Sequence, residues 1–193
     1  MIKVIVIGSN GLLGQTLLKQ LLDTNCSVIA FSKGENRFPK KDGYHYFSID
    51  VTNTDLLLQT IRAIKPNYII NTAAITNVDF CEDNKELCDA VNVESVKQLT
   101  KVCKELDAHL IHISTDFIFD GKNGPYKETD IPNPINYYGK SKLLSEEVLL
   151  NSTIDYTILR TILVYGKVAK MSKSNFVFWI KETLEDFDKV TVV

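Results

Sequence analysis

The chain has 193 residues, 45% of them hydrophobic, and its 22 basic and 24 acidic residues give a formal net charge of −2. This length suits one α/β domain, or one domain with part of a second, and the apolar content is enough for a buried core. The near balance of charge, without a basic stripe or an aromatic ladder, argues against nucleic acid as a partner. No apolar stretch is long enough to cross a bilayer, so no membrane association is expected.

Strand-length apolar runs alternate with segments of helical periodicity along the chain. In chain order, the first half predicts strand Lys3–Ile7, a helix through Leu13–Leu22, strands Ser27–Phe31 and Tyr44–Ile49, helix Asp55–Ile64 and strand Tyr68–Asn71. The second half predicts helix Lys85–Leu106, strand His109–Ser114, a loop Asp120–Asn136, a helix from Tyr137, strand Tyr156–Arg160, helix Asn175–Leu184 and strand Lys189–Val193. This alternation predicts an α/β fold with a doubly wound parallel sheet of the Rossmann type.

The cysteines show no metal-binding spacing. Cys26, Cys81, Cys88 and Cys103 include no Cys-x-x-Cys pair, and only three histidines accompany them. We therefore expect no metal site, and free, mostly buried thiols in a reducing cytoplasm. The apolar N-terminus lacks a basic run and a cleavage site, so it is interpreted as a buried strand rather than a signal peptide.

A glycine-rich segment lies between the first expected strand and the first expected helix, where phosphate-binding loops occur. Gly8 suits a tight turn, Gly11 a close approach of the backbone to a pyrophosphate, and Gly14 close packing of helix on strand. The N–H groups at the helix start, next to Asn10 and Leu12, would bind the phosphate charge. A turn without a ligand is the alternative, but this context favours a dinucleotide.

The end of the second strand indicates which dinucleotide binds. An NAD site usually has an acidic residue there, but this strand is followed by Ser32 and Lys33, with Arg37 nearby. These residues fit a 2′-phosphate and favour NADPH, with NADH as the alternative if the two cations are ordinary solvated charges. Asp50 is placed to accept a hydrogen bond from adenine, with Val51 packing on the ring; Asp50 could equally cap the next helix.

A tyrosine and a lysine are spaced four residues apart at the start of a helix. This spacing puts Tyr138 and Lys142 on one helical face, where a cation would lower the pKa of the phenol. Lys142 could also hold the ribose. A carbonyl would need one more hydroxyl, and Ser114 or Thr115 could supply it from a strand end, with only one of the two facing the site.

The chain resembles the dTDP-4-dehydrorhamnose reductase family of extended short-chain dehydrogenases/reductases. Five segments carry the resemblance in the order of the family: G-S-N-G-L-L-G-Q from Gly8, N-T-A-A-I-T-N-V-D from Asn71, S-T-D-F-I-F-D-G from Ser114, P-x-N-x-Y-G-K-S-K ending at Lys142, and L-R-T-I-L-V-Y-G ending at Gly166. The resemblance implies reduction of the 4-keto group of a nucleotide-linked deoxysugar by NADPH or NADH.

The resemblance also implies roles for individual residues. It assigns catalysis to Thr115, Tyr138 and Lys142, and thereby chooses Thr115 over Ser114. It assigns dinucleotide contacts to Asn71, Ala73 and Ala74, contacts near the nicotinamide and sugar to Thr76, Val78 and Asp79, and a structural role to Asn92.

Members of this family continue for roughly another hundred residues. Residues 1–193 are therefore expected to form the dinucleotide-binding domain, with the substrate-binding part missing or only begun near 167–193. We expect cofactor binding without efficient turnover, because remote contacts to the substrate are lost. Two alternatives are a non-catalytic NADP-binding subunit similar to the β subunit of methionine adenosyltransferase, and a reductase or epimerase of another nucleotide sugar. The oligomeric state stays open, a homodimer included.

Overall fold

The computed structural model describes residues 1–170, 176–186 and 189. Within these residues, six parallel strands form one sheet in the order β3-β2-β1-β4-β5-β6. The strands are β1 (Lys3–Ile7), β2 (Ser27–Ser32), β3 (Tyr44–Ser48), β4 (Tyr68–Asn71), β5 (His109–Thr115) and β6 (Tyr156–Thr161). The order runs outward in both directions from β1 and β4, which confirms the doubly wound sheet. In such sheets ligands bind at the carboxyl ends of the strands, at this switch point.

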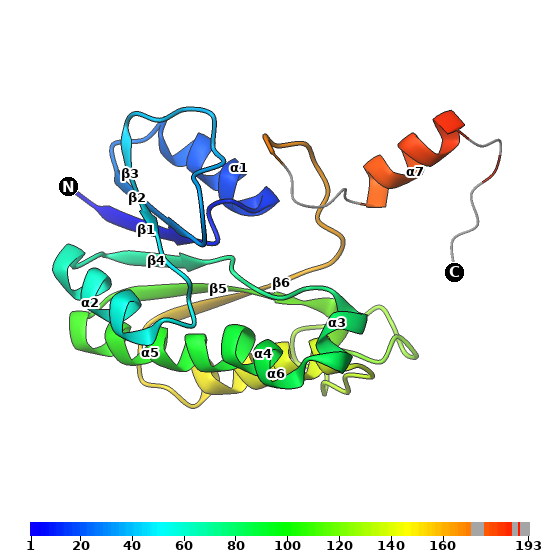
Figure 1. Cartoon of the computed structure of the whole chain (residues 1–193). Coiled ribbons are helices and arrows are strands. Elements are labelled where there is room, and N and C mark those ends of the chain that lie inside the picture. The colour runs from blue at the N-terminus through cyan, green and yellow to red at the C-terminus, as the bar shows by residue number, and fades with distance from the viewer. Residues whose placement is uncertain (171–175, 187–188, 190–193) are drawn as a thin grey trace.

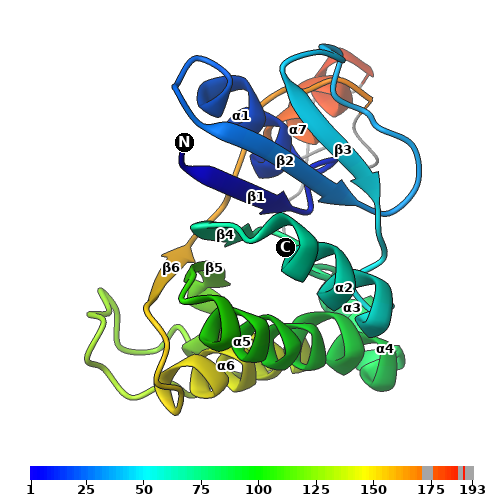
Figure 2. The ribbon, with the colours of Figure 1, turned by 90° about the vertical axis from the view of Figure 1, so that its left-hand side faces the viewer.

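Helices cover the two faces of the sheet unequally. Helix α1 (Leu12–Leu21) lies on one face, and α2 (Thr54–Ile64), α5 (Ser95–Leu106) and α6 (Tyr137–Leu150) lie on the other (Figures 1 and 2). Helix α7 (Phe176–Asp186) stands apart from the sheet in Figure 1. The shorter elements are α3 (Val78–Asp83), α4 (Lys85–Asp89), a π-helical turn (Ala90–Glu94) and a 3-10 turn (Asp116–Ile118).

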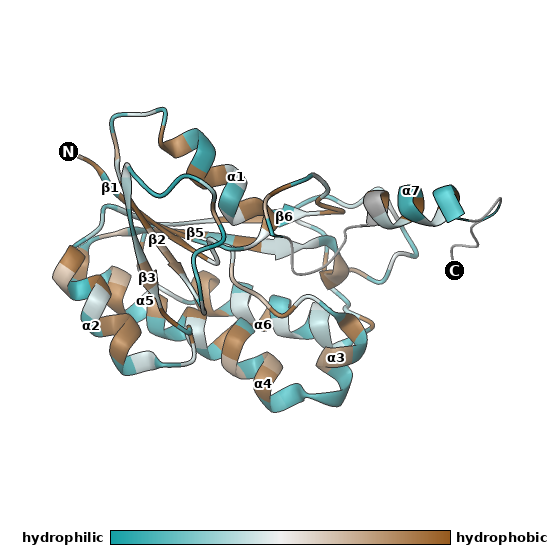
Figure 3. Cartoon of the chain, turned by 45° about the horizontal axis from the view of Figure 1, so that its top comes forward, coloured by the Kyte–Doolittle hydropathy of each residue, from teal (hydrophilic) through white to brown (hydrophobic). Residues whose placement is uncertain are grey.

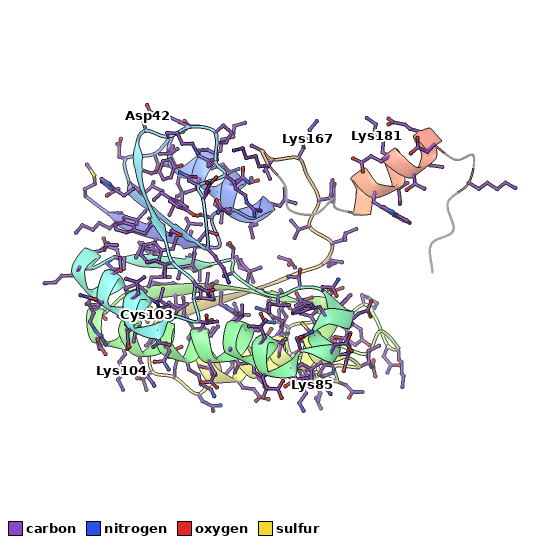
Figure 4. All side chains as sticks on the ribbon, viewed as in Figure 1. Asp42, Lys85, Cys103, Lys104, Lys167 and Lys181 are labelled. Carbon is purple, nitrogen blue, oxygen red and sulfur yellow. The ribbon has the colours of Figure 1, made fainter. Side chains whose placement is uncertain are left out.

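Alternation along the strands builds a core on each face. Ile5 and Ile7 pack into a large cluster with α2 and α5, whereas Val6, between them, packs with Leu18 of α1. The central strands are accordingly the most hydrophobic part of the ribbon in Figure 3. On α5, Cys103 is buried against the sheet while Lys104 points to solvent, as Figure 4 shows. The four cysteines are free and three of them are buried, as expected.

The expected helix Lys85–Leu106 is interrupted. The structure divides it into α4, the π-helical turn and α5, and the short helix α3 before it was not expected. The π-helical turn contains Asn92, whose side chain accepts a hydrogen bond from Ile75 N at 2.8 Å. Single π-helical turns often occur at functional sites, where they redirect a side chain.

Two expectations fall at the end of the chain. The expected helix Asn175–Leu184 corresponds to α7, although position 175 lies outside the described residues. The expected strand Lys189–Val193 also lies outside them, apart from position 189. In the described part of the chain, no helix is long and apolar enough to span a membrane, and no group of three metal-ligating side chains comes together.

Candidate active site

Two of the three loop glycines are required by packing. Gly8 has a φ of +82°, and a Cβ there would lie 2.6 Å from Thr72 Oγ1 and 2.7 Å from Ala73 N. A Cβ on Gly14 would overlap the carbonyl oxygen of Gly8. The turn therefore brings the start of α1 onto the ends of β1 and β4, and no larger residue fits at either position.

Gly11 differs from the other two because the fold leaves room for a side chain there. A Cβ there would meet only the Gly8 oxygen, at 3.3 Å, and its φ of −76° suits any residue. Gly11 is the N-cap of α1, no side chain caps this helix, and its first turn holds no acidic residue. Uncapped N–H groups at a helix start attract anions. The geometry fits a phosphate group approaching the backbone at Gly11.

The loop separates two cavities, of about 580 and 410 Å³. Asn10, Gly11, Thr72 and Ala74 border both of them. Besides the shared residues, the larger cavity brings together six predicted site residues: Leu12, Gly14, Thr76, Thr115, Tyr138 and Lys142. Besides the shared residues, the smaller cavity brings together seven: Gly8, Ser32, Lys33, Arg37, Asp50, Val51 and Ala73. A dinucleotide has two halves joined by a pyrophosphate, so two cavities joined at a glycine loop match its shape.

Asn10 holds the loop that carries the two predicted cations. Its amide nitrogen donates to Glu35 O at 2.8 Å and to Lys33 O at 3.3 Å, and its oxygen accepts from Arg37 N at 2.9 Å. Tyr46 on β3 completes the support, because its hydroxyl donates to Gly34 O at 2.6 Å. Asn10 thus fixes the loop that borders the smaller cavity. Tyr46 is a further supporting residue, which the sequence did not reveal.

Asp50 and Lys33 form an ion pair, with Nζ 2.8 Å from Oδ2. The pKa of Asp50 is lowered, first by the hydrogen bond from Lys33 and then by the one from the Thr52 backbone. Helix α2 is capped by Asn53, whose side chain accepts from Leu56 N, so the alternative that Asp50 caps this helix is wrong. Asp50 instead lines the smaller cavity and keeps the exposed Lys33 beside it.

Thr115 is the strand-end hydroxyl that affects the tyrosine. It borders the larger cavity together with Tyr138 and lowers the pKa of the phenol, whereas Ser114 Oγ is buried and has no hydrogen-bond partner among the described residues. Helix α6 can approach this strand end because Gly139 has no Cβ. A Cβ at this position would overlap the carbonyl oxygen of Phe117. The Tyr138 ring then packs edge-on against Phe117, with 5.8 Å between ring centroids.

The expected effect of Lys142 on Tyr138 is wrong in this structure. The pKa of Tyr138 is raised, mainly because the phenol is buried, and Lys142 is not among the causes. Lys142 lies in the core, with Nζ 3.0 Å from His112 Nε2, and burial lowers its pKa to about 7. His112 is a further residue of this region that the sequence did not reveal.

Some predicted residues do not line either cavity. Asn71 is buried, with its oxygen accepting from Ala73 N at 3.2 Å and its nitrogen 3.3 Å from His112 Nδ1. Val78 and Asp79 begin α3, outside the residues that border the cavities. Their predicted contacts with dinucleotide and sugar are therefore not visible in the geometry.

An ion pair between Glu146 and Arg160 holds α6 against the sheet. Glu146 has no exposed surface and accepts from Arg160 Nη2 at 2.7 Å and Nε at 3.0 Å, which joins α6 to β6. Its negative charge raises the pKa of Lys142 against the larger effect of burial. The end of β6 and the chain after it complete the larger cavity with residues missing from the predicted set: Thr161, Ile162, Leu163, Val164 and Val168.

Residues 2–193 match the family model described as RmlD substrate binding domain. The chain is 35% identical over 195 residues to a dTDP-4-dehydrorhamnose reductase of Aggregatibacter actinomycetemcomitans, covering 100% of this chain and 60% of the relative. It is 30% identical over 174 residues to methionine adenosyltransferase 2 subunit beta of Bos taurus, covering 89% of this chain and 50% of that protein. The chain thus spans between half and about three fifths of these curated relatives.

Solved structures agree with the fold. A dTDP-4-dehydrorhamnose reductase from Clostridium acetobutylicum superposes with a TM-score of 0.84 at 32% identity, covering 100% of this chain and 62% of that one. A reductase of the same name from Bacillus anthracis, solved in complex with NADP, gives a TM-score of 0.79 at 30% identity, covering 97% of this chain and 61% of its own.

Proposed function

Because the chain belongs to the dTDP-4-dehydrorhamnose reductase family, whose RmlD substrate binding domain model it matches, we propose that it binds NADPH, or NADH, and serves carbonyl reduction. The observation that carries this proposal is the pair of cavities joined at Gly11, with Thr115, Tyr138 and Lys142 around the larger one. A solved relative that binds NADP supports the choice of cofactor.

In this proposal the smaller cavity holds the adenosine half. The uncapped start of α1 binds the pyrophosphate, and Asp50 and Val51 contact adenine. Ser32, Lys33 and Arg37 surround the position of the 2′-phosphate, with Lys33 kept there by Asp50. Removing the Arg37 charge should therefore weaken NADPH binding more than NADH binding, and equal weakening would contradict this assignment.

The larger cavity holds the chemistry. A nicotinamide held in this cavity would supply the hydride for the carbonyl carbon of the substrate. Tyr138 supplies a proton to the carbonyl oxygen, and its raised pKa keeps the phenol protonated at neutral pH, as a general acid requires. Thr115 borders the same cavity and lowers the pKa of Tyr138, and Lys142 provides a positive charge on the same helix.

The proposed substrate is the 4-keto group of a nucleotide-activated deoxysugar, on the strength of the family. Residues from about 167 onward would begin the sugar-nucleotide pocket, next to the apolar segment 161–164. The test is oxidation of NADPH by dTDP-4-dehydrorhamnose with the protein at its natural length. Tyr138→Phe should reduce the rate by about 10²-fold or more with little change in NADPH affinity.

Tyr137→Phe is the matched control. Its hydroxyl binds Asp89 Oδ2 at 2.8 Å and does not border the cavity, so this variant should keep its activity. If Tyr138→Phe retained full activity, Tyr138 would not be the acid.

A second candidate is a non-catalytic NADP-binding subunit, because subunits of methionine adenosyltransferase are among the similar proteins. Both functions need the cofactor cavities, but only the reductase needs the Tyr138 hydroxyl. NADPH binding with no oxidation by any 4-keto nucleotide sugar, in the protein at its natural length, would favour the subunit.

A further inference from the structure

A buried polar cluster lies directly behind the larger cavity. It joins Asn71 of β4, His112 of β5, and Lys142 and Ser145 of α6, all of them almost without exposed surface. His112 Nε2 is 2.9 Å from Ser145 Oγ and 3.0 Å from Lys142 Nζ. His112 Nδ1 is 3.3 Å from the amide nitrogen of Asn71. Buried polar groups need matched donors and acceptors, so the positions of the protons can be worked out.

The hydrogen bonds of Asn71 determine the tautomer of His112. The backbone N–H of Ala73 donates to Asn71 Oδ1 at 3.2 Å, which identifies the oxygen and leaves the NH₂ group facing His112. An NH₂ group can only donate, so His112 Nδ1 is the nitrogen without a proton. Burial lowers the pKa of His112 well below its usual value, so the ring is neutral and its proton is on Nε2.

This proton faces both Ser145 and Lys142. The Ser145 hydroxyl donates to Lys142 O at 2.6 Å, so its oxygen is free to accept from His112 Nε2–H. An ammonium group at Lys142 Nζ would offer only donors to the same N–H group, whereas a neutral amine offers a lone pair. Among the described residues, Nζ has no other hydrogen-bond partner. The position that Lys142 occupies in the core therefore suits the amine and not the ammonium ion.

We propose that His112 is a positioning residue. Its Nε2–H group pairs with Lys142 in the core only when Lys142 is a neutral amine, and dinucleotide binding moves Lys142 into the cavity as an ammonium ion. Lys142 already borders the cavity, so the two positions are one side-chain movement apart. This inference rests on the proposed dinucleotide binding. The proton comes from solvent, and binding near pH 8 takes up close to one proton for each dinucleotide.

The other charged and titratable groups around Lys142 are consistent with this movement. Glu146 of α6 and Cys88 of α4 both raise the pKa of Lys142, and burial outweighs them. The Glu146 carboxylate is also paired with Arg160 of β6, and its stabilisation of an ammonium ion in the core is smaller than the effect of burial. Tyr138 of α6 borders the same cavity as a neutral phenol and offers the ammonium group an acceptor there.

The first test measures proton uptake by calorimetry of the 193-residue chain with NADH, in buffers of different ionisation enthalpy. NADH is the probe because it lacks the 2′-phosphate, which titrates itself. We expect uptake of about one proton at pH 8, because a pKa of about 7 leaves Lys142 mostly neutral before binding. In His112→Gln the side-chain oxygen can accept from the ammonium ion, which favours the charged form of Lys142 before binding, so uptake should fall below that of the unmodified chain.

His109→Gln is the matched control, because His109 lies on the same strand and bonds Thr157 instead. The His109→Gln variant should take up the same number of protons on NADH binding as the unmodified chain. Unchanged uptake in His112→Gln would overturn the proposal.

The second test needs no variant. Nitrogen NMR of the unmodified chain near pH 8 should show His112 protonated on Nε2 and unprotonated on Nδ1. The reverse tautomer would overturn the proposal even if His112→Gln failed to fold. Absence of NADH and NADPH binding would instead sink the proposed function, and the tautomer would still be measurable.

Discussion

Gly11→Ala should separate dinucleotide binding from folding. The added methyl group meets only the Gly8 oxygen, at 3.3 Å, in a backbone conformation that alanine adopts freely. Alanine is a poorer N-cap than glycine, so the expected loss of stability is about 0.5–1 kcal/mol, or about 1–4 °C in melting temperature. The methyl group also stands where both cavities meet, so the Kd for NADPH should rise at least about tenfold, which is about 1.4 kcal/mol.

Gly14→Ala provides the contrast. Its Cβ overlaps the Gly8 carbonyl oxygen, so the backbone must move, and overpacking of this kind costs about 1–3 kcal/mol. Thermal unfolding followed by circular dichroism and NADPH fluorescence titration measure the two quantities on the same samples. Wild-type affinity in a folded Gly11→Ala variant would refute the approach of the pyrophosphate to this backbone position.

Three further predictions concern the larger cavity. Thr115→Val should raise the pKa of Tyr138 further, because the Thr115 hydroxyl lowers that pKa; absorbance titration of the phenol measures it, and no change would exclude this effect of Thr115. Lys142 titrates at about pH 7 in the folded chain and near 10.4 when unfolded, so between these values the unfolded state binds the extra proton. The stability of wild type relative to Lys142→Met should therefore rise by about 1.4 kcal/mol per pH unit from pH 7 toward 10 in chemical denaturation, and a flat difference would contradict a neutral buried lysine. Glu146→Ala should cost about 1–3 kcal/mol in the same assay, because it removes the buried acceptor of the partly exposed Arg160, whereas a loss below about 0.5 kcal/mol would show that the pair does not form in solution.

The sequence predicted the sheet and the glycine loop because both depend on local patterns. Residues Val4–Ile7 of β1 are buried on both faces, so they show continuous hydrophobicity, and glycine is nearly obligatory where a Cβ would collide, as at Gly8. The fine structure of Lys85–Leu106 was not predictable in this way. Its π-helical turn accompanies a contact between Asn92 and Ile75, and hydrophobic periodicity does not register such a contact.

The site was predicted less completely than the fold. A spacing of four residues puts Tyr138 and Lys142 on one helical face, but it does not say what else that face meets. The proximity of His112 to Lys142 depends on the packing of α6 against β5, thirty residues away along the chain. Long-range contacts of this kind decide whether a lysine stabilises a phenolate or lies as an amine in the core. They also explain why Asn10, which borders both cavities, holds the neighbouring loop as well.

The central claim is that the two cavities joined at Gly11 bind one dinucleotide. Calorimetric titration of the 193-residue chain with NADPH tests it most directly, with Gly11→Ala as the comparison. The account predicts one NADPH for each chain and clearly weaker binding in the variant, together with a rise in melting temperature when NADPH is in excess. Absence of both heat and thermal shift with NADPH and with NADH would contradict it.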